Sequence, residues 1–580
     1  MLVDSCMLKE LKLELAKAIA SAAQVNEEQA LASLELPKGE FGDLASKVAF
    51  ILAAEKKTNP VQIANEIANQ LNNKKLKFIQ RIETKGPYLN FYFNNGFYAE
   101  ALKKILKEKQ KFGTAKKKTG KQIMVEFFHA NTHKGVHIGH IRNVSTGEAL
   151  CKLLEITGNK IIRANFQGDI GPHVAKCLWG FLNLYNGKAP TSNRGIWLGK
   201  VYSEASKKIK EEKEKGNDEL EKQVQEINLK LYAKDKKMNE LWKKTRQWCL
   251  DDFKEFYKEF NVKFDELYFE SQTEKVGTEV VKNALKRGIA KEDQGAIIMD
   301  LRDDNLGVYV LLTKEGYPLY STKDLGLAKL KFDKYDLDRS IHVVGKEQEH
   351  HFKQLFKTFE KIGMEKAAKI SHHLIYELVM LPEGKMSSRE GTMVLYEDLK
   401  QKLLEITRSE IKKRHETWSE KEIEKIAMQI TLAAIRFSML RRENNKVLVF
   451  DWDQALSTEG DSGPYLQYAF VRTLGILSKT KEKATAEKSY AFNLDEKRLI
   501  KKLCEFSQLV EKAAHDLAPN YLTDYLLDVA TDFNKFYTVS PVLTAEKENE
   551  RRSRLAIVSA SNILLKSGLG LLGIECPERM

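Results

Sequence analysis

Residues 125–140 read VEFFHANTHKGVHIGH, and this stretch decides the fold of the chain. The apolar run 123–128 predicts a buried strand, and a helix is expected to begin near Gly139. A second apolar run follows at 160–166 and leads into Gly168-Asp169-Ile170-Gly171. Strand, helix and strand in this order indicate a right-handed βαβ unit, which builds parallel sheets.

The loop after the first expected strand is a candidate binding site, because ligands of parallel sheets bind beyond the carboxyl ends of the strands. His137 and His140 lie three residues apart, so they share one face on the first turn of a helix. Two imidazoles beside free backbone N–H groups suit phosphate oxygens, and Gly139 lets a nucleotide approach closely. Two unrelated histidines near a helix start are the alternative.

Three other residues carry polar groups at informative positions. Glu126 lies inside the apolar run, and a buried carboxylate needs a cationic partner. Either a lysine or arginine of the protein or a ligand can supply that cation, and the residue alone leaves both open. Tyr320 and Asp324 open another expected helix four residues apart and share a face, although an acidic residue there also suits ordinary helix capping.

A glycine-bounded loop follows the expected strand 374–381 and contains Lys385, Met386, Ser387, Ser388 and Arg389. A lysine, two hydroxyls and an arginine can grip a triphosphate, and such a loop can open and close over a substrate. An ordinary surface turn has the same composition. Because this loop follows the histidine pair along the chain, we favour the interpretation that it binds a triphosphate.

Composition limits the class of protein. A chain of 580 residues, 42% hydrophobic and 30% charged, predicts several domains of a soluble globular protein without a membrane span or a targeting segment. Its six scattered cysteines contain no CxxC pair, which favours a reducing cytoplasm and argues against zinc sites. Lys+Arg exceed Asp+Glu by 95 − 81 = 14, which indicates a polyanionic partner or a lysine-rich solvated surface.

The rest of the chain continues the α/β pattern and then changes character. Residues 203–260 are dense in lysine and glutamate, so we expect a solvated helical pair inserted between two halves of the sheet. Strand-like runs resume at 296–301, 308–312, 340–345 and 374–381. Beyond about residue 400 the sequence predicts helices only.

The histidine segment and the lysine loop resemble the HIGH and KMSKS signatures of class I aminoacyl-tRNA synthetases. Over nearly the whole chain the sequence resembles the arginyl-tRNA synthetase family. Three further blocks carry this resemblance: NFQGDIG at 165–171, FDWD at 450–453 followed by EGDSGPYLQYA at 459–469, and the C-terminal LGLLGI at 569–574 with PERM at 577–580.

The resemblance implies a multidomain α/β fold with a parallel Rossmann-type catalytic sheet and a helical insertion. It implies a small α+β N-terminal domain at 1–112, which binds the tRNA elbow at the D-loop, and a catalytic domain at 113–400 with its insertion at about 203–260. A helical connection at 401–458 would contact the tRNA stem. An all-helical anticodon-binding domain would occupy 459–580.

The resemblance also implies roles for individual positions. The expected arginine pocket is formed by Glu126, Tyr320 and Asp324 for the guanidinium and by Asn131 and Gln348 for the α-amino and carboxylate groups. The expected ATP site is formed by Lys134, His137, Gly139, His140, His373 and the loop residues Lys385, Met386, Ser387, Ser388 and Arg389. The expected tRNA contacts are Asn94, Phe97, Tyr465, Tyr468, Arg472 and Met580. From spacing alone, Tyr465 and Tyr468 are favoured as core residues of a helix.

The implied activity is the ATP- and Mg²⁺-dependent activation of L-arginine to arginyl-adenylate, followed by transfer to the 3′-terminal adenosine of tRNA(Arg). Activation would require bound tRNA. Two carboxylates and a phenol match the five donors of arginine well enough that no editing domain is expected. The chain is further expected to act as a cytoplasmic monomer without a resident structural metal.

The sequence departs from the family pattern at two places. Phe128-His129-Ala130 stands where many members have small residues and a proline, and Ser388 replaces the second lysine of KMSKS. Lys134, just ahead of the histidine pair, is the expected compensating cation. Two rival interpretations remain: a class I synthetase for another amino acid, and a non-catalytic tRNA-binding paralogue.

Overall fold

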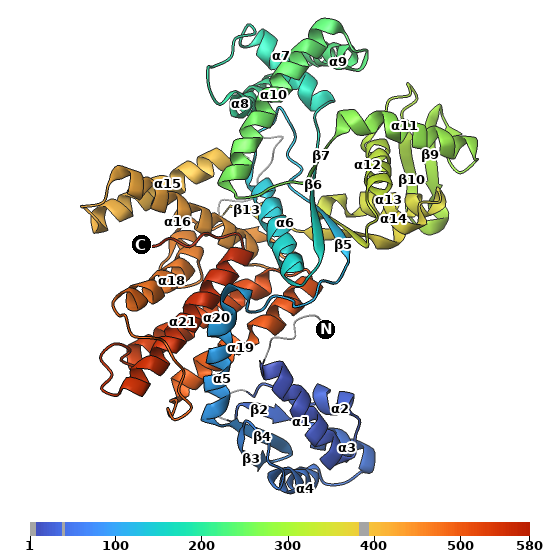
Figure 1. Cartoon of the computed structure of the whole chain (residues 1–580). Helices are drawn as coiled ribbons and strands as arrows, with labels where there is room; N and C mark the ends of the chain where they lie inside the picture. The colour runs from blue at the N-terminus through green and yellow to red at the C-terminus, as the bar shows by residue number, and fades with distance from the viewer. Residues whose placement is uncertain (1–6, 38–40, 382–393) are drawn as a thin grey trace.

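A five-stranded parallel sheet lies at the centre of the upper half of the molecule in Figure 1, in the computed structural model that describes residues 7–37, 41–381 and 394–580. Its strands are β5 (Gln122–Glu126), β6 (Lys160–Gln167), β7 (Glu266–Phe269), β11 (Arg339–Gly345) and β12 (Ser371–Tyr376), in the order β12-β11-β5-β6-β7. Every neighbouring pair is parallel, as the sequence predicts.

The chain connections on the two sides of β5 run in opposite directions across the sheet, and this leaves an opening for a ligand. From β5 the chain crosses through helix α6 (Ile138–Ile156) to β6 on one side, whereas β11 pairs with the other side of β5. In open α/β sheets such a switch point is where the loops after two adjacent strands diverge and leave a crevice. The loop that begins at Phe127 therefore borders this crevice.

The insertion after β6 is longer than the sequence suggests. It contains α7 (Pro172–Asn183), α8 (Arg194–Glu214), α9 (Glu219–Tyr232) and α10 (Lys236–Glu259), so the expected helical pair at 203–260 is instead part of a larger helical layer. Short polar turns separate α8 from α9 and α9 from α10, with left-handed backbone at Gly216 and Lys234. Such turns carry little signal within a charged run.

Two of the expected strands belong to a second sheet. Strands β8 (Lys291–Asp293), β9 (Ala296–Leu301) and β10 (Gly307–Leu312) form an antiparallel sheet in the order β10-β9-β8. Strand β10 has exposed residues at Val308 and Val310 and buried ones at Tyr309 and Leu311, the alternation of a sheet with one solvated face. Helices α11 (Glu270–Lys286), α12 (Tyr320–Lys334), α13 (Glu349–Lys361) and α14 (Glu365–Ile370) accompany it.

The expected strand 374–381 is two strands. The first, β12, ends at Tyr376, and the second, β13 (Val379–Met380), leaves the parallel sheet to pair with β14 (Leu448–Val449). At the break, the backbone N–H of Glu377 donates to the carbonyl of Asn444 at 2.8 Å. A contact with so distant a segment has no signature in the local sequence.

The N-terminal domain is a small α+β unit. Its antiparallel sheet has the order β1-β2-β4-β3, and its elements are α1 (Met7–Ala23), α2 (Glu27–Ala32), β1 (Leu34–Glu35), β2 (Leu44–Ser46), α3 (Val48–Lys56), α4 (Pro60–Asn72), β3 (Ile79–Lys85), β4 (Tyr88–Phe93) and the exit helix α5 (Asn95–Glu108). Lys501 of the C-terminal helices forms an ion pair with Asp43 at 2.8 Å, which joins the domain to them.

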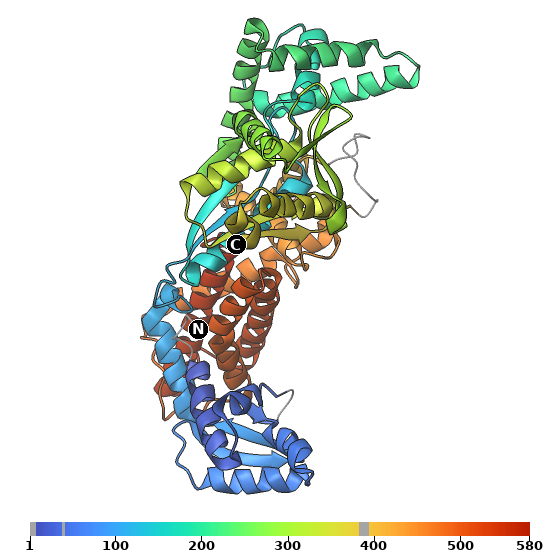
Figure 2. The ribbon, with the colours of Figure 1, turned by 90° about the vertical axis from the view of Figure 1, so that its right-hand side faces the viewer.

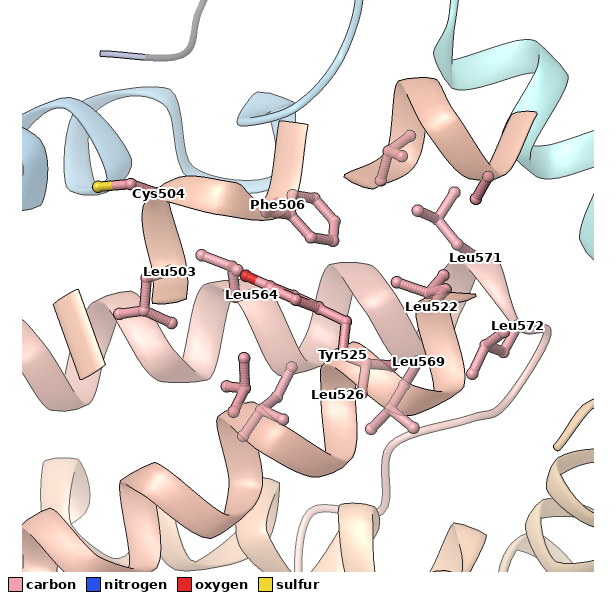
Figure 3. Close-up of a cluster of buried hydrophobic side chains, with 14 of the residues drawn as sticks. Leu503, Cys504, Phe506, Leu522, Tyr525, Leu526, Leu564, Leu569, Leu571 and Leu572 are labelled. Atoms are coloured by element: carbon pink, nitrogen blue, oxygen red, sulfur yellow. The ribbon is translucent and has the colours of Figure 1, made fainter. Parts of the chain in front are cut away.

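The C-terminal third is helical and lies between the N-terminal domain and the parallel sheet (Figures 1 and 2). Its helices are α15 (Tyr396–Arg414), α16 (Glu420–Leu440), α17 (Trp452–Leu456), α18 (Gly463–Ser478), α19 (Leu494–His515), α20 (Asn520–Val539) and α21 (Glu548–Leu571). Figure 3 shows Phe506, Leu526 and Leu564 in the apolar cluster where α19, α20 and α21 meet. None of the helices in the described residues is long and apolar enough to span a membrane.

Candidate active site

A cavity of about 810 Å³ opens at the carboxyl ends of β5 and β11. It is large enough for an amino acid and a nucleotide together. The predicted site residues that line it are Glu126, Asn131, His137, Gly139, His140, Tyr320, Asp324 and Gln348. These residues come from β5, the loop after it, α6, α12 and the segment after β11, so the fold gathers positions that are more than 200 residues apart in the sequence.

The two histidines of the signature stand together at the start of α6. Their ring centroids are 3.7 Å apart, and the backbone N–H of His137 donates to Nδ1 of His140 at 3.2 Å. The ring proton of a neutral His140 is therefore on Nε2. Burial, with the charge of nearby Lys134, lowers the pKa of His137 to about 4, and burial lowers that of His140 well below its usual range. Both rings are neutral N–H donors at pH 7.

The cation beside this pair is Lys134, in the loop between β5 and α6. Its Nζ lies 5.2 Å from the centre of the Tyr202 ring on α8, which holds the ammonium over an aromatic face. Because the imidazoles are neutral, Lys134 carries the positive charge at this end of the site in the described part of the chain. Lys134 does not itself line the cavity, and its compensating role stays a prediction.

The unusual Phe128-His129 segment has an unusual backbone. Phe128 and His129 have φ values of 82° and 53°, in the left-handed region that non-glycine residues rarely adopt. Phe128 is fully buried, and its ring stacks on Phe256 of α10 at 4.9 Å. Tertiary packing therefore holds the strained loop, and the loop in turn places Asn131, whose side-chain oxygen accepts the N–H of Gly168 at 3.0 Å.

Asp324 projects from the first turn of α12 beside Tyr320. One carboxylate oxygen, Oδ2, accepts a hydrogen bond from Nε2 of His351 at 2.6 Å. The Tyr320 side chain is 59% exposed and packs edge-on against the same histidine, with centroids 4.8 Å apart. The spacing of four residues thus places a phenol and a carboxylate on one wall of the cavity.

Of the two cations that the sequence leaves open for Glu126, the structure shows one that the protein supplies. Glu126 pairs with Lys331 of α12, and Nδ1 of His342 donates to its other oxygen at 3.4 Å. Burial favours a raised pKa for Glu126, but Lys331 and His342 outweigh it and hold the pKa well below its usual range. The protein itself therefore neutralises this carboxylate, because an unpaired charge on a buried strand is too costly.

His373 falls outside the cavity lining. His373 stacks on Phe352, a lining residue, at 4.3 Å, and its Nε2 donates to the carbonyl of Val344 at 3.0 Å. Direct contact with an adenine stays a prediction for this residue. Lys385, Met386, Ser387, Ser388 and Arg389 lie outside the described residues.

A second cavity, of about 440 Å³, is lined by Tyr468 and Arg472 of α18. Tyr468 is 38% exposed, and its hydroxyl accepts from Arg472 at 3.1 Å. Tyr465 is nearly buried and its hydroxyl accepts from Asn534 at 3.1 Å, which fits the core position that spacing favours. Met580 packs in a different place, on the apolar cluster of α15 and α16.

The two expected contacts of the N-terminal domain differ in accessibility. Asn94 is the N-cap of α5, and its side-chain oxygen accepts the N–H of Phe97 at 3.2 Å. Phe97 itself is fully buried, 4.4 Å from Phe93 between ring centroids. The expectation that Phe97 touches tRNA is therefore corrected: an inward side chain in an aromatic core stabilises the domain and presents no surface to RNA.

Sequence reasoning missed the residues that support the site. Lys331 and His351 hold the two carboxylates, and Lys323 bonds Glu270, another cavity residue, at 2.7 Å. Lys331 lies seven residues after Asp324, so helical spacing could have placed it on the same face. Nothing local marks His351. In the described ranges no three His, Cys, Asp or Glu side chains gather as a metal site.

Three family models match the chain, and together they account for most of it. The model "tRNA synthetases class I (R), catalytic domain" matches residues 101–452, the "Arginyl tRNA synthetase N terminal domain" matches 9–93, and the "DALR anticodon binding domain" matches 466–580. The first of these alone covers more than half of the chain.

Relatives and solved structures agree with these models. The arginine–tRNA ligase of Bdellovibrio bacteriovorus is 35% identical over 94% of this chain and 93% of its own length, and that of Treponema denticola is 34% identical over 94% of each. Thermus thermophilus arginyl-tRNA synthetase superposes with a TM-score of 0.78 at 26% identity, over 98% of this chain and all of that one. The chain therefore belongs to the arginyl-tRNA synthetase family of class I aminoacyl-tRNA synthetases.

Proposed function

We propose that the 810 Å³ cavity holds L-arginine and ATP side by side for the first step catalysed by this arginine–tRNA ligase. The observation that carries the proposal is the meeting in one cavity of a carboxylate–phenol wall, Asp324 with Tyr320, and the neutral histidine pair of α6. The first feature suits a guanidinium and the second suits phosphate oxygens.

Arginine would be recognised at both of its ends. Its guanidinium has five N–H donors and a fixed charge, and Asp324 and Tyr320 offer acceptors for them. Since Lys331 neutralises Glu126, Asp324 is the carboxylate proposed to meet the guanidinium directly, with Glu126 behind it. Asn131 and Gln348, which also line the cavity, are proposed to hold the α-amino and carboxylate groups.

ATP would lie over the start of α6. His137 and His140 would donate their N–H groups to phosphate oxygens and Lys134 would add the positive charge. Lys385 and Arg389 are proposed to bind the triphosphate as well. Mg²⁺ would arrive as part of the ATP complex. The side chains at this end offer imidazole and ammonium N–H donors, which suit phosphate oxygens. The ion would therefore take its ligands from the triphosphate.

The proposed chemistry needs positioning more than covalent help. A carboxylate oxygen of arginine attacks the α-phosphorus in line, a new O–P bond forms, and the bond to the leaving pyrophosphate breaks. The 2′-hydroxyl of the terminal adenosine of tRNA(Arg) then attacks the carbonyl carbon, and AMP leaves. The side chains above would hold the reactants and stabilise the charge on the phosphate oxygens.

The tRNA would also be bound at surfaces outside this cavity. We propose that Tyr468 and Arg472 contact unstacked anticodon bases, with Tyr465 supporting them from within α18. Met580, which packs on the apolar cluster of α15 and α16, is proposed as a separate contact with the anticodon loop. Asn94 is proposed to border the surface that meets the tRNA elbow. In this proposal the elbow-binding unit is 1–112 and the catalytic unit is 113–400. The unit that contacts the tRNA stem is 401–458, and the anticodon-binding unit is 459–580. The enzyme would act as a monomer in the cytoplasm.

Asp324→Ala tests the arginine pocket. It should raise the KM for arginine by at least about 10-fold, because a charged hydrogen-bond partner is lost, and leave the KM for ATP within about twofold. ATP–pyrophosphate exchange in the presence of tRNA measures both. Asp333→Ala, at an exposed carboxylate of the same helix, is the matched control. An unchanged arginine KM in Asp324→Ala would overturn the pocket.

A further inference from the structure

His351 lines the same cavity and touches both side chains of the proposed guanidinium wall. It lies on α13, is buried, and bonds Oδ2 of Asp324 at 2.6 Å through Nε2. Its ring also packs edge-on against Tyr320, with centroids 4.8 Å apart. One residue from a different helix therefore supports the two residues that α12 presents to the cavity.

A third residue, Tyr309, contacts the other ring nitrogen of His351. The hydroxyl of Tyr309, on β10, lies 2.9 Å from Nδ1 of His351. An ionised carboxylate has no proton to give, so Nε2 carries the proton that Asp324 accepts. In the corresponding neutral tautomer, Nδ1 accepts the proton of the phenol. Burial raises the pKa of Tyr309 well above its usual range, which keeps that phenol a donor.

The resulting chain runs from Tyr309 through His351 to Asp324 and ends at the cavity. With Oδ2 held by His351, the plane of the Asp324 carboxylate is fixed while the side chain still lines the cavity. A fixed plane matters for a planar, forked guanidinium, which makes parallel hydrogen bonds. It matters much less for an ammonium, whose three donors rotate about one point.

We propose that His351 is a positioning residue for amino-acid selection, which orients the Asp324 carboxylate for a guanidinium and so favours arginine over lysine. This proposal rests on the proposed function of Asp324 and adds to it the residue that sets its orientation. His351 acts through Asp324 and Tyr320 and is not assigned to the reacting atoms.

The test compares His351→Leu with His351→Gln in tRNA-dependent ATP–pyrophosphate exchange. Leucine fills the space without a donor, whereas the glutamine amide can donate from near the place of Nε2. We expect His351→Leu to raise the KM for arginine by about 10-fold and His351→Gln by about threefold or less, with the KM for ATP unchanged in both. The preference for arginine over lysine should fall in His351→Leu only.

Tyr309→Phe gives a second route to the same answer if the leucine variant folds poorly. It keeps the ring and removes only the hydroxyl that orients His351, so the KM for arginine should rise by about threefold. In an Asp324→Ala background, His351→Leu should add less than about twofold, because its effect passes through that carboxylate.

The outcomes separate the two proposals. An unchanged arginine KM in Asp324→Ala overturns the proposed function of the pocket and the role of His351 with it. A raised KM in Asp324→Ala beside an unchanged one in His351→Leu and Tyr309→Phe overturns the role of His351 alone. Equal losses in the leucine and glutamine variants, or losses that multiply in the double variant, also overturn it, since they indicate packing instead of orientation.

Discussion

His133 shows how tightly single residues are built into the signature loop. Its ring is fully buried, with Nδ1 2.9 Å from the Thr132 hydroxyl and Nε2 2.8 Å from the Thr245 hydroxyl of α10. Thr245 donates its own proton to the carbonyl of Leu241 at 2.9 Å, so Nε2 of His133 must be the donor to Thr245. Burial, and then the charge of Arg246, lowers the pKa of His133 to about 3.

This depressed pKa predicts acid sensitivity with a definite sign. An unfolded chain protonates this histidine below its ordinary pKa of 6.5, whereas the folded protein resists protonation down to about 3. The contribution of His133 to the free energy of unfolding is therefore constant above that ordinary value. It falls as the pH drops through this window, by at most about 1.4 kcal/mol for each pH unit. In His133→Gln, the melting temperature should fall less between pH 7 and pH 5 than in the wild type.

The control for this prediction is His515→Gln, since the His515 side chain is 88% exposed. Thermal melts of the three proteins at pH 7, 6 and 5 make the comparison, and the other titrating groups cancel. Equal pH dependence of the wild type and His133→Gln would contradict the role assigned to the buried ring.

At the scale of elements, helix α10 connects the loops around the site. Besides His133, it holds the loop after β6, because Nε of Arg246 bonds Oδ2 of the fully buried Asp169 at 2.7 Å. Near its other end, Glu259 accepts from Nζ of Lys400 on α15 at 3.0 Å. One helix of the insertion thus reaches the loops after β5 and β6 and the helix that follows the lysine loop.

Arg246→Met tests whether α10 stabilises these loops. Removing the cation leaves Asp169 buried with only the backbone and hydroxyl donors of Ser271 at 2.9 and 2.7 Å, which favours local opening. Amide hydrogen exchange in residues 128–137 and 168–171 should become at least about fivefold faster.

Arg302→Met serves as its control, because Arg302 pairs with Asp300 at the surface and its side chain is 68% exposed. The control should leave exchange in both loops unchanged. Exchange in 128–137 that is the same in Arg246→Met and the wild type would contradict the view that α10 holds the signature loop.

The elements and the site were predictable to different degrees. Apolar runs and loop positions predicted β5, β6 and α6, and the spacing of four predicted that Tyr320 and Asp324 share a wall. The partner of Glu126 was not predictable from β5, because Lys331 approaches it from α12 through tertiary packing. The burial of Phe97 likewise depends on neighbouring aromatic rings.

At the scale of the whole molecule, the C-terminal helices hold a cation, Arg472, against aromatic rings far along the chain from the active-site residues. Nη1 of Arg472 bonds Asn534 at 2.6 Å, and its guanidinium lies 4.8 Å and 5.6 Å from the ring centres of Tyr468 and Tyr537. A guanidinium held against two rings at a cavity suits stacking with an unpaired base.

Arg472→Ala should therefore weaken tRNA binding without changing the distant active site. We expect the KM for tRNA in aminoacylation to rise by about 10-fold, with the KM values for arginine and ATP unchanged at saturating tRNA. Arg302→Ala, in the lobe of the second sheet, controls for the loss of one positive charge. A parallel rise in the KM for arginine, or an unchanged KM for tRNA, would contradict the view that Arg472 acts on tRNA binding and not on the active site.

ATP–pyrophosphate exchange with each of the twenty amino acids, with and without tRNA, is the most direct test of whether this cavity activates arginine. The arrangement of Tyr320, Asp324 and the histidine pair in one cavity predicts exchange with arginine alone, and the family resemblance predicts that it requires tRNA. Exchange with another amino acid would contradict the assignment of the pocket. Exchange with none of them would contradict the proposal that this cavity activates an amino acid.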